Sequence, residues 1–464
     1  MELSTSVLQY SITPASRWRG MELKGKRVMV LGVARTGSAT ARFLVQQGAE
    51  VVVTDRRGAE GLKEELDALA GLPIRYRLGG EDMRWLEGVE SVIPSPGVPP
   101  SNPLLSEAQR RGIEILSEIE LAYRFLRCPL VAVTGTNGKS TTTTLIGEAL
   151  KAQGLRVFTG GNIGQPLIGF ASGPWDWGVA EISSFQLEWV EQFRPRIAVL
   201  LNLTEDHLDR YPDFASYRAA KERIFRAQEQ EDAAVLNRDD PFVWAMRERL
   251  RSRVFSFGWK EAPRGTFSTG KTILWRDEAT EEEFPISRVK IQGVHNVENL
   301  MAVITVAKLL QVPRETIQEV IEEFPGLEHR LEFVREKNGV RFYNDSKGTN
   351  VGATLKSLMG FSEPVILLAG GIDKGGDYRI VEEEIQRKVK RLILFGAAKE
   401  TLHRALGHRT AASLVDSLED AVAEACKSAR PGDVVLLSPA CSSFDMFRDY
   451  AERGKVFKAL VQGL

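Results

Sequence analysis

Short apolar runs alternate along the whole chain with longer stretches whose apolar residues recur at helical spacing. Near the start, residues 26–33 and 51–55 are such runs, and a helical pattern through Leu44 lies between them. The runs are continuously apolar, which is typical of strands buried on both faces of a parallel sheet. This rhythm predicts an α/β fold built from repeated strand–helix units.

Two further units repeat the rhythm. Their strands are expected at residues 130–134, 156–158, 177–182 and 196–202, and then at 340–344, 365–369, 392–395 and 434–437. Between residues 255 and 283 the pattern breaks into short pieces with glycine and proline turns, which predicts hairpins that decorate the second unit. The breaks near Arg127 and in 324–330 predict three domains, at residues 1–127, 128–327 and 328–464.

The first twenty residues show neither periodic pattern nor the apolar region of a secretory signal. Met1-Glu2-Leu3 recurs as Met21-Glu22-Leu23, directly before the first strand. We therefore expect residues 1–20 to lie outside the folded core, with Met21 as an alternative start. A chain beginning at Met21 is expected to keep full activity and melting temperature, and a loss of more than a few degrees would contradict this.

The stretch from Val131 to Thr143 passes from apolar strand to glycine-rich turn to helix. In that order, backbone N–H groups and a helix N-terminus can surround a polyphosphate. Lys139 would reach the terminal phosphates, and the Ser140 hydroxyl would complete a Mg²⁺ shell. Val133 stands where the full P-loop pattern has its first glycine, so this is a shortened P-loop. An ordinary turn with a chance Lys-Ser pair is the alternative.

A second glycine pattern, Gly32-Val-Ala-Arg-Thr-Gly37, follows the first strand, with Asp55 ending the next one. This is nearly the dinucleotide fingerprint, but Ala34 replaces the glycine that lets the backbone approach a pyrophosphate. We interpret the segment as a Rossmann-like nucleotide-binding unit and not as an oxidoreductase.

Polar residues gather where the later strands end, at residues 160–164, 181–186, 202–211, 345–350, 370–374 and 438–445. Ligands of open α/β sheets bind outside the carboxyl ends of the strands. These loops are therefore expected on the P-loop side of their sheets, which suggests a multi-substrate enzyme with its site between domains.

Individual residues leave alternatives open. Glu181 in an apolar strand suits a bound Mg²⁺, but it could be a strand-end carboxylate in water. His207 alone is more often structural, and Thr204 could simply cap a short helix over the acidic residues around it. Lys221, judged by its local sequence, is a solvated helix residue. Asn296 and Asn299 could cap a helix or read a base edge.

Composition narrows the class of protein. A formal net charge of −1 argues against a surface built for nucleic acid or an anionic membrane. Cys128, Cys426 and Cys441 have no metal-binding spacing, which indicates a reducing, cytoplasmic setting without disulfides or structural zinc. No apolar run approaches the roughly 18 residues needed to span a bilayer.

Several motifs resemble those of the Mur ligase family, over residues 25–460. The P-loop form Thr-Gly-Thr-Asn-Gly-Lys-Ser (134–140) also occurs in folylpolyglutamate synthases. The branch that adds D-glutamate is indicated by motifs in the central and last units, at residues 161–164, 181–188, 203–212, 344–350, 437–445 and 453–454.

The resemblance implies a Rossmann-like UDP-binding domain, a central P-loop ATPase domain with a parallel sheet, and a C-terminal Rossmann-like domain that binds the amino acid. It implies that ATP phosphorylates the carboxylate of UDP-MurNAc-L-alanine and that the amine of D-glutamate attacks the acyl phosphate, in the cytoplasmic synthesis of peptidoglycan precursors. ATP and two Mg²⁺ sites, one through a carbamylated Lys221, are the implied cofactors. The implied protein is a monomer that binds no nucleic acid and is not inserted in a membrane.

The resemblance also assigns site residues. The implied catalytic residues are Lys139, Glu181, His207, Lys221 and Lys347. Those for ATP are Gly135, Thr136, Asn137, Gly138, Lys139, Ser140, Thr141, Asn296, Asn299, His329, Arg330 and Asp345. Those for the UDP substrate are Arg35, Thr36, Asp55, Arg56, Gly97, Asn162 and Gln186. Those for D-glutamate are Thr349, Lys374, Ser443, Phe444 and Tyr450, and those for metal are Ser140, Glu181, His207 and Lys221.

The alternatives are a folylpolyglutamate synthase-like ligase, an NAD-binding oxidoreductase, and a nucleotide-gated binding protein without chemistry. The oxidoreductase is weakened by Ala34 and by the P-loop.

Overall fold

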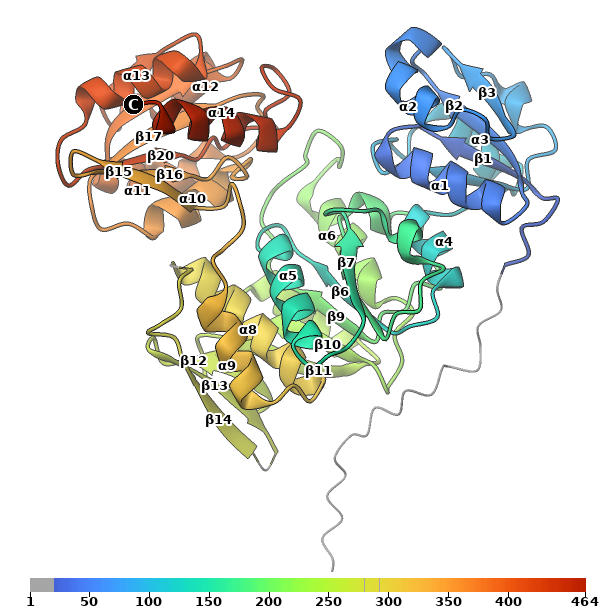
Figure 1. The fold of residues 1–464 in the computed structure, drawn as a ribbon, viewed down its shortest axis with the longest axis horizontal. Coiled ribbons are helices and arrows are strands. Elements are labelled where there is room, and N and C mark those ends of the chain that lie inside the picture. Colours follow the sequence, from blue (N-terminus) through green and yellow to red (C-terminus); the bar gives the residue numbers. More distant parts are fainter. Residues whose placement is uncertain (1–20, 279, 292) are drawn as a thin grey trace, which may run out of the picture.

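The apolar runs of the sequence form the strands of three sheets in the described part of the chain, which is residues 21–278, 280–291 and 293–464 of a computed structural model (Figure 1). The expectation for residues 1–20 lies outside that part. The central strands are buried on both faces, as their continuous apolar character predicts. The α/β class is therefore confirmed.

The N-terminal lobe, residues 21–125, is a parallel sheet in the order β3-β2-β1-β4-β5. Its elements are β1 (Arg27–Leu31), α1 (Arg35–Gln46), β2 (Glu50–Asp55), η1 (Ala59–Leu62), α2 (Lys63–Ala68), β3 (Ile74–Leu78), η2 (Met83–Leu86), β4 (Ser91–Pro94), α3 (Pro103–Arg110), β5 (Glu114–Ile115) and α4 (Glu118–Phe125).

The central lobe, residues 130–323, carries the P-loop. Its sheet has the order β14-β13-β12-β11-β10-β9-β6-β8-β7. Its elements are β6 (Leu130–Thr134), α5 (Lys139–Lys151), β7 (Val157–Gly161), η3 (Leu167–Phe170), β8 (Trp177–Glu181), η4 (Phe185–Leu187), β9 (Ile197–Leu200), α6 (Phe214–Glu222), η5 (Arg223–Phe225), β10 (Ala233–Asn237), α7 (Pro241–Trp244), η6 (Ala245–Arg249), β11 (Arg253–Gly258), β12 (Gly265–Ser268), β13 (Thr272–Asp277), β14 (Thr280–Pro285), α8 (Val294–Leu309) and α9 (Arg314–Glu323).

The segment predicted as decorating hairpins matches that expectation in part. β11 and β12 continue the parallel sheet beyond β10, whereas β12 with β13 and β13 with β14 form antiparallel hairpins. The segment therefore widens the sheet. The outer strand β14 is mostly polar and exposed, so the apolar periodicity that marks a buried strand is missing there.

The C-terminal lobe, residues 332–462, has a sheet in the order β15-β16-β20-β17-β18-β19, with β15 antiparallel at its edge. Its elements are β15 (Glu332–Lys337), β16 (Val340–Asn344), α10 (Val351–Met359), β17 (Val365–Gly370), η7 (Tyr378–Val381), α11 (Glu382–Lys388), β18 (Val389–Phe395), α12 (Lys399–Leu406), β19 (Ala412–Leu414), α13 (Leu418–Ser428), β20 (Val434–Leu437) and α14 (Tyr450–Gln462).

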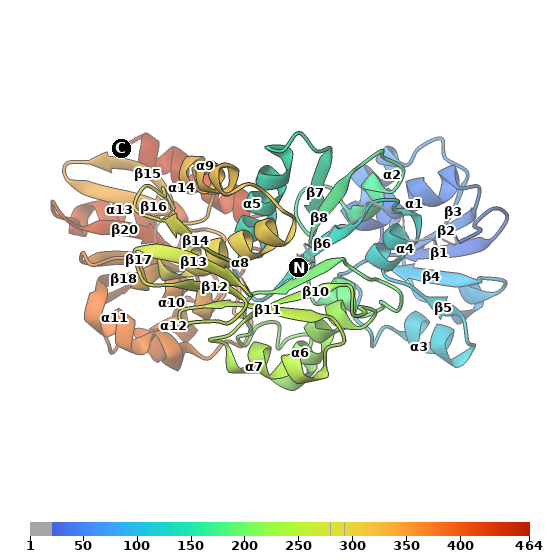
Figure 2. The ribbon, with the colours of Figure 1, turned by 90° about the horizontal axis from the view of Figure 1, so that it is seen from below.

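The lobes lie side by side with the central lobe in the middle (Figure 2). One apolar core runs from the N-terminal lobe through α4 into the central lobe. The C-terminal lobe has cores of its own on the two faces of its sheet. No hydrophobic cluster of the described residues spans the boundary between the central and C-terminal lobes, here called the seam, so polar side chains can line it.

Candidate active site

The glycine-rich loop joins β6 to α5, as the strand–loop–helix pattern predicts. Gly138 has a φ of 86°, and a Cβ atom on it would lie 2.2 Å from Asn299 Oδ1, so a larger residue would clash. Asn202 fixes the loop from the end of β9. Its Oδ1 accepts from the backbone N–H of Asn137 at 2.8 Å, and its Nδ2 donates to the Asn137 carbonyl at 3.1 Å. The loop is thus held by the residue that follows β9.

Two lysine ammonium groups meet at one carbonyl oxygen. Lys139 Nζ and Lys221 Nζ each donate to the Gly135 carbonyl at 2.9 Å. Lys221 lies on α6 and is only 2% exposed, which excludes the solvated-surface alternative. Burial lowers the pKa of Lys221 well below its ordinary value, and the positive charge of Lys139 lowers it further. Burial also lowers the pKa of Lys139.

Glu181 ends β8 beside the P-loop and is 1% exposed, which excludes a carboxylate in water. Its Oε2 accepts from the Ser140 hydroxyl, and its Oε1 accepts from Asn162 Nδ2 at 2.6 Å. Burial raises the pKa of the Glu181 carboxyl, but the charge of Lys139 and these hydrogen bonds outweigh burial, so the pKa lies below its ordinary value. The site therefore holds a buried, ionised carboxylate.

His207 follows β9 in an irregular loop, and the short helix that Thr204 could have capped is not formed. Its φ of 57° is unusual for a residue with a side chain. The imidazole packs edge-on against Phe185 with ring centroids 4.7 Å apart, and its Nε2 lies 3.8 Å from Asp206 Oδ2. Burial lowers the pKa of His207 to about 4, although Asp206 opposes the shift. The imidazole is neutral at neutral pH.

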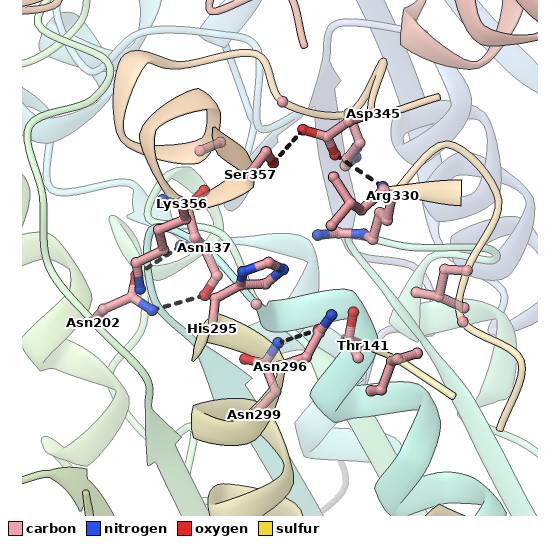
Figure 3. A pocket seen from close by; sticks show the side chains of 18 residues that line it. Asn137, Thr141, Asn202, His295, Asn296, Asn299, Arg330, Asp345, Lys356 and Ser357 are labelled. Carbon is pink, nitrogen blue, oxygen red and sulfur yellow. Dashed lines mark hydrogen bonds between the residues drawn. The ribbon is translucent and has the colours of Figure 1, made fainter. Parts of the chain in front are cut away.

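An open pocket of about 680 Å³ lies at the seam (Figure 3). Its lining includes seven residues predicted for ATP and the predicted catalytic Lys347: Asn137, Gly138, Thr141, Asn296, Asn299, Arg330, Asp345 and Lys347. Asn299 Nδ2 donates to Asn296 Oδ1 at 3.3 Å. The two asparagines therefore lie together at the pocket, and neither caps the helix, whose N-cap is Gly293.

Arg330 and Asp345 bring the C-terminal side to this pocket. Arg330 Nη2 donates to the Ser140 hydroxyl at 2.8 Å, across the seam. Asp345 Oδ2 accepts from the hydroxyls of Ser357 and Ser438 at 2.7 and 2.8 Å. Burial raises the pKa of Asp345 to about 6 despite these bonds. A nucleotide at the P-loop would therefore meet an arginine and a carboxyl group from the other lobe.

His329 is placed differently from the other residues predicted for ATP. It is buried with a φ of 64°, and it is not among the residues that line the pocket. Asn344 Nδ2 donates to His329 Nδ1 at 2.9 Å. In this structure the imidazole binds the last residue of β16 and helps to hold that strand in place.

The residues predicted for D-glutamate occupy the neighbouring loops of the C-terminal lobe. Lys374 Nζ donates to Thr349 Oγ1 at 3.5 Å and lies 3.9 Å from Asp206 Oδ1, so the lysine reaches across the seam. Lys347 Nζ lies 3.6 Å from the centroid of the Tyr450 ring. Burial, together with the charge of Arg330, lowers the pKa of Lys347 to about 7. Ser443 is buried, whereas Phe444 is 70% exposed.

The residues predicted for the UDP substrate lie at the ends of strands, away from the seam pocket. Arg35, Thr36, Asp55, Arg56 and Gly97 follow β1, β2 and β4 of the N-terminal lobe. Asp55 accepts from the backbone N–H of Val33 at 3.1 Å and pairs with Arg57, whereas Arg56 is largely exposed.

Asn162 and Gln186 follow β7 and β8 of the central lobe. Gln186 lines a small pocket together with Ser95 and Arg210. This pocket therefore has walls from both the N-terminal and the central lobe.

Sequence reasoning missed four residues of the site: Asn202, Asp206, His295 and Lys356. Asn202 and Asp206 lie in a loop noted as polar, but their contacts depend on the fold. His295 and Lys356 line the seam pocket, and His295 Nδ1 is buried without a hydrogen-bond partner in the described structure. The position of His295 directly before Asn296 was the only signal available.

Among residues 21–278, 280–291 and 293–464, no group of three or more His, Cys, Asp or Glu side chains is arranged to hold a metal ion. No helix in the same residues is both long and apolar enough to cross a membrane.

Comparison with known proteins gives three family models in order along the chain. They are "Mur ligase MurD-like, N-terminal domain" at residues 26–117, "Mur ligase middle domain" at 133–307, and "Mur ligase, glutamate ligase domain" at 329–441. Among solved structures, the pseudomurein peptide ligase type C from Methanothermus fervidus matches with a TM-score of 0.58 at 18% identity, covering 95% of this chain and 100% of that one. The MurF ligase from Thermotoga maritima in complex with ADP matches with a TM-score of 0.58 at 17% identity, covering 89% and 95%. These two likenesses establish the fold.

Curated relatives are more similar. Proteins named UDP-N-acetylmuramoylalanine--D-glutamate ligase from Trichlorobacter lovleyi and Geobacter metallireducens are each 49% identical over 447 residues. The aligned region covers 96% of this chain and 100% and 99% of the two relatives. By this similarity along nearly its full length, the chain belongs to the Mur ligase family, among the UDP-N-acetylmuramoylalanine--D-glutamate ligases.

Proposed function

We propose that this enzyme joins D-glutamate to the alanine carboxyl group of UDP-N-acetylmuramoyl-L-alanine, a step of peptidoglycan precursor synthesis. ATP transfers its γ-phosphoryl group to the carboxylate, giving an acyl phosphate and ADP. The D-glutamate amine attacks the acyl phosphate and loses a proton, and the tetrahedral intermediate releases phosphate to leave the amide. The observation that carries the proposal is the hydrogen bond to Ser140 of the P-loop from Arg330, in the segment that leads into the C-terminal lobe. The relatives' names give no support to a folylpolyglutamate synthase-like ligase or a protein without chemistry.

The residues at the phosphate end suit phosphoryl transfer. Such a reaction needs its partners held in line and needs cations near the phosphoryl oxygens. Those cations are supplied by Lys139, Arg330 and Lys347. The charge of Lys139 contributes to the lowered pKa of Lys347. We assign Lys139 to the β and γ phosphates and Lys347 to the γ phosphate and the incoming amino acid.

Mg²⁺ fits beside Ser140 and Glu181. A hard cation prefers oxygen ligands, and here a hydroxyl and an ionised carboxylate lie within hydrogen-bond distance of each other. Bound Mg²⁺ would neutralise charge on the phosphoryl oxygens. The hydrogen bond from Asn162 holds the carboxylate in place for that cation.

We assign a carbamate to Lys221. Two ammonium groups that share one carbonyl oxygen in a buried site repel each other, and burial already favours the neutral amine. Only the neutral amine reacts with CO₂, and the product is an anionic oxygen ligand. Together with neutral His207, carbamylated Lys221 would hold a second Mg²⁺.

The remaining assignments concern the other ligands and the assembly. The UDP end is assigned to the strand ends of the N-terminal lobe, with Asn162 and Gln186 from the central lobe. We also propose domains at residues 1–127, 128–327 and 328–464, and the three separate sheets support this division. We also propose a monomer that acts in the cytoplasm.

The choice of acceptor tests the glutamate pocket. D-glutamate is expected to be used far better than D-glutamine or D-alanine, because leaving the partly buried Lys374 without a carboxylate partner costs more than losing an ordinary hydrogen bond. Lys374→Ala is expected to raise the KM for D-glutamate strongly and to leave ATP binding nearly intact. Steady-state phosphate release with each amino acid measures both effects. Comparable turnover with D-alanine would contradict the assignment.

A further inference from the structure

Some contacts across the seam use residues that are assigned to substrates, namely Arg330, Ser140 and Lys374. Arg330 donates to Ser140, and Asn350 Nδ2 donates to Asp206 Oδ2 at 3.1 Å, near Lys374. Bound ATP and D-glutamate would compete for several of these groups. None of the hydrophobic clusters of the described residues joins the central lobe to the C-terminal lobe. Other contacts therefore have to hold the two lobes in position while substrates are bound.

A further ion pair crosses the seam between α10 and α8, beside the pocket. Lys356 Nζ on α10 donates to Glu298 Oε2 on α8 at 3.0 Å. Glu298 Oε1 also accepts from Trp259 Nε1 at 3.4 Å, so the central lobe orients the carboxylate. The side chains of Lys356 and Glu298 are 29% and 18% exposed. Neither residue is among those assigned to a substrate, and both lie on helices.

The pair lies beside the part of the pocket where the asparagines of α8 converge. Lys356 lines the pocket together with His295, which precedes Glu298 by one turn of α8 (Figure 3). Burial, and then the charge of Lys356, lower the pKa of His295 to about 4. The ring is therefore neutral, and its buried Nδ1 lacks a partner in the described residues. This is the end of the pocket suited to a polar heterocycle, because the phosphates belong at the P-loop.

We propose that Lys356 and Glu298 are positioning residues that set the spacing of the two lobes at the base end of the pocket. Binding of the base against α8 and docking of the C-terminal lobe are thereby coupled. The inference rests on the proposed function only in that the seam pocket takes ATP. The pair acts on substrates through the lobe positions and touches no reacting atom.

Exchanging the charges of Lys356 and Glu298 tests whether this ion pair positions the two lobes. Lys356→Ala and Glu298→Ala are each expected to weaken ADP binding, measured by calorimetry, and to raise the KM for ATP and D-glutamate by about two- to five-fold with kcat nearly unchanged. The exchanged double variant, Lys356→Glu with Glu298→Lys, is expected to recover most of the loss. Lys356→Arg is expected to stay near wild type. Arg391→Ala breaks a pair with Glu424 of similar exposure inside the C-terminal lobe, and it should change none of these values.

Two results would overturn the inference: single variants that bind ADP as wild type does, or an exchanged variant no better than the singles although its melting temperature is normal. Calorimetry with ADP needs no ligation chemistry. If wild type binds ADP but forms no amide, the proposed function fails while the test of the pair stands. If wild type forms the amide and the single variants bind ADP normally, only the pair is wrong.

Discussion

Replacing Lys221 with alanine is expected to lower kcat by about a thousand-fold, with ADP binding and melting temperature little changed. The buried amine shares the Gly135 carbonyl with Lys139, and as a carbamate it would turn a repelled positive charge into an anionic oxygen ligand. Alanine removes that ligand and leaves the space empty. Steady-state phosphate release is the measurement. Lys151→Ala, on the exposed face of α5, is the matched control and should behave as wild type.

Chemical rescue separates a carbamate from an ammonium. Formate and other small carboxylates are expected to restore part of the activity of Lys221→Ala, because they supply an anionic oxygen at the vacated place. Lys221→Arg should not be rescued, since guanidinium keeps its charge and fills the space. Near-normal activity of Lys221→Ala, or a bare ammonium group in a high-resolution structure with Mg²⁺ and nucleotide bound, would refute the carbamate.

Replacing Glu181 with glutamine is expected to lower kcat by about a hundred- to a thousand-fold. The amide keeps the shape and can still hydrogen-bond Ser140 and Asn162, but it lacks the charge that the cation needs. The Mg²⁺ concentration for half-maximal activity should therefore rise. A magnesium titration of phosphate release measures this shift.

Stability has to be controlled for that variant. Because the surroundings of Glu181 favour its ionised form, the neutral amide is expected to lower the melting temperature, so the magnesium titration is measured well below the unfolding temperature of both proteins. Glu148→Gln, on the exposed side of α5, should leave the magnesium titration unchanged. An unchanged titration in Glu181→Gln would show that this carboxylate is not a metal ligand.

The local pattern of apolar and glycine residues was sufficient to predict the buried strands and the P-loop. β6 and β20 begin and end where the apolar runs do, because a strand buried on both faces shows its length directly in the sequence. β3, β5, β10, β15 and β19 were not predicted. All except β10 are edge strands with exposed positions, and β10 is a short run without alternation.

The contacts that make the site could not be predicted from neighbours in the chain. Arg330 and Ser140 are 190 residues apart, so their hydrogen bond depends on how the lobes meet. The left-handed backbone of His207 and His329 has no signal in residue type. Lys221 has the local sequence of a solvated lysine, and only the fold shows it buried under the P-loop. The sequence pattern predicts the loops that form the site. The burial of their side chains and the hydrogen bonds between them are set by the way the sheets assemble.

The most direct test of the account measures phosphate release from ATP by the wild-type protein. The assay contains UDP-N-acetylmuramoyl-L-alanine and one of a panel of D- and L-amino acids, and the mass of the product is determined by mass spectrometry. The account predicts release that requires both the UDP substrate and D-glutamate, and a product heavier by one glutamyl residue. Release that does not depend on D-glutamate, or equal release with other amino acids, would contradict it.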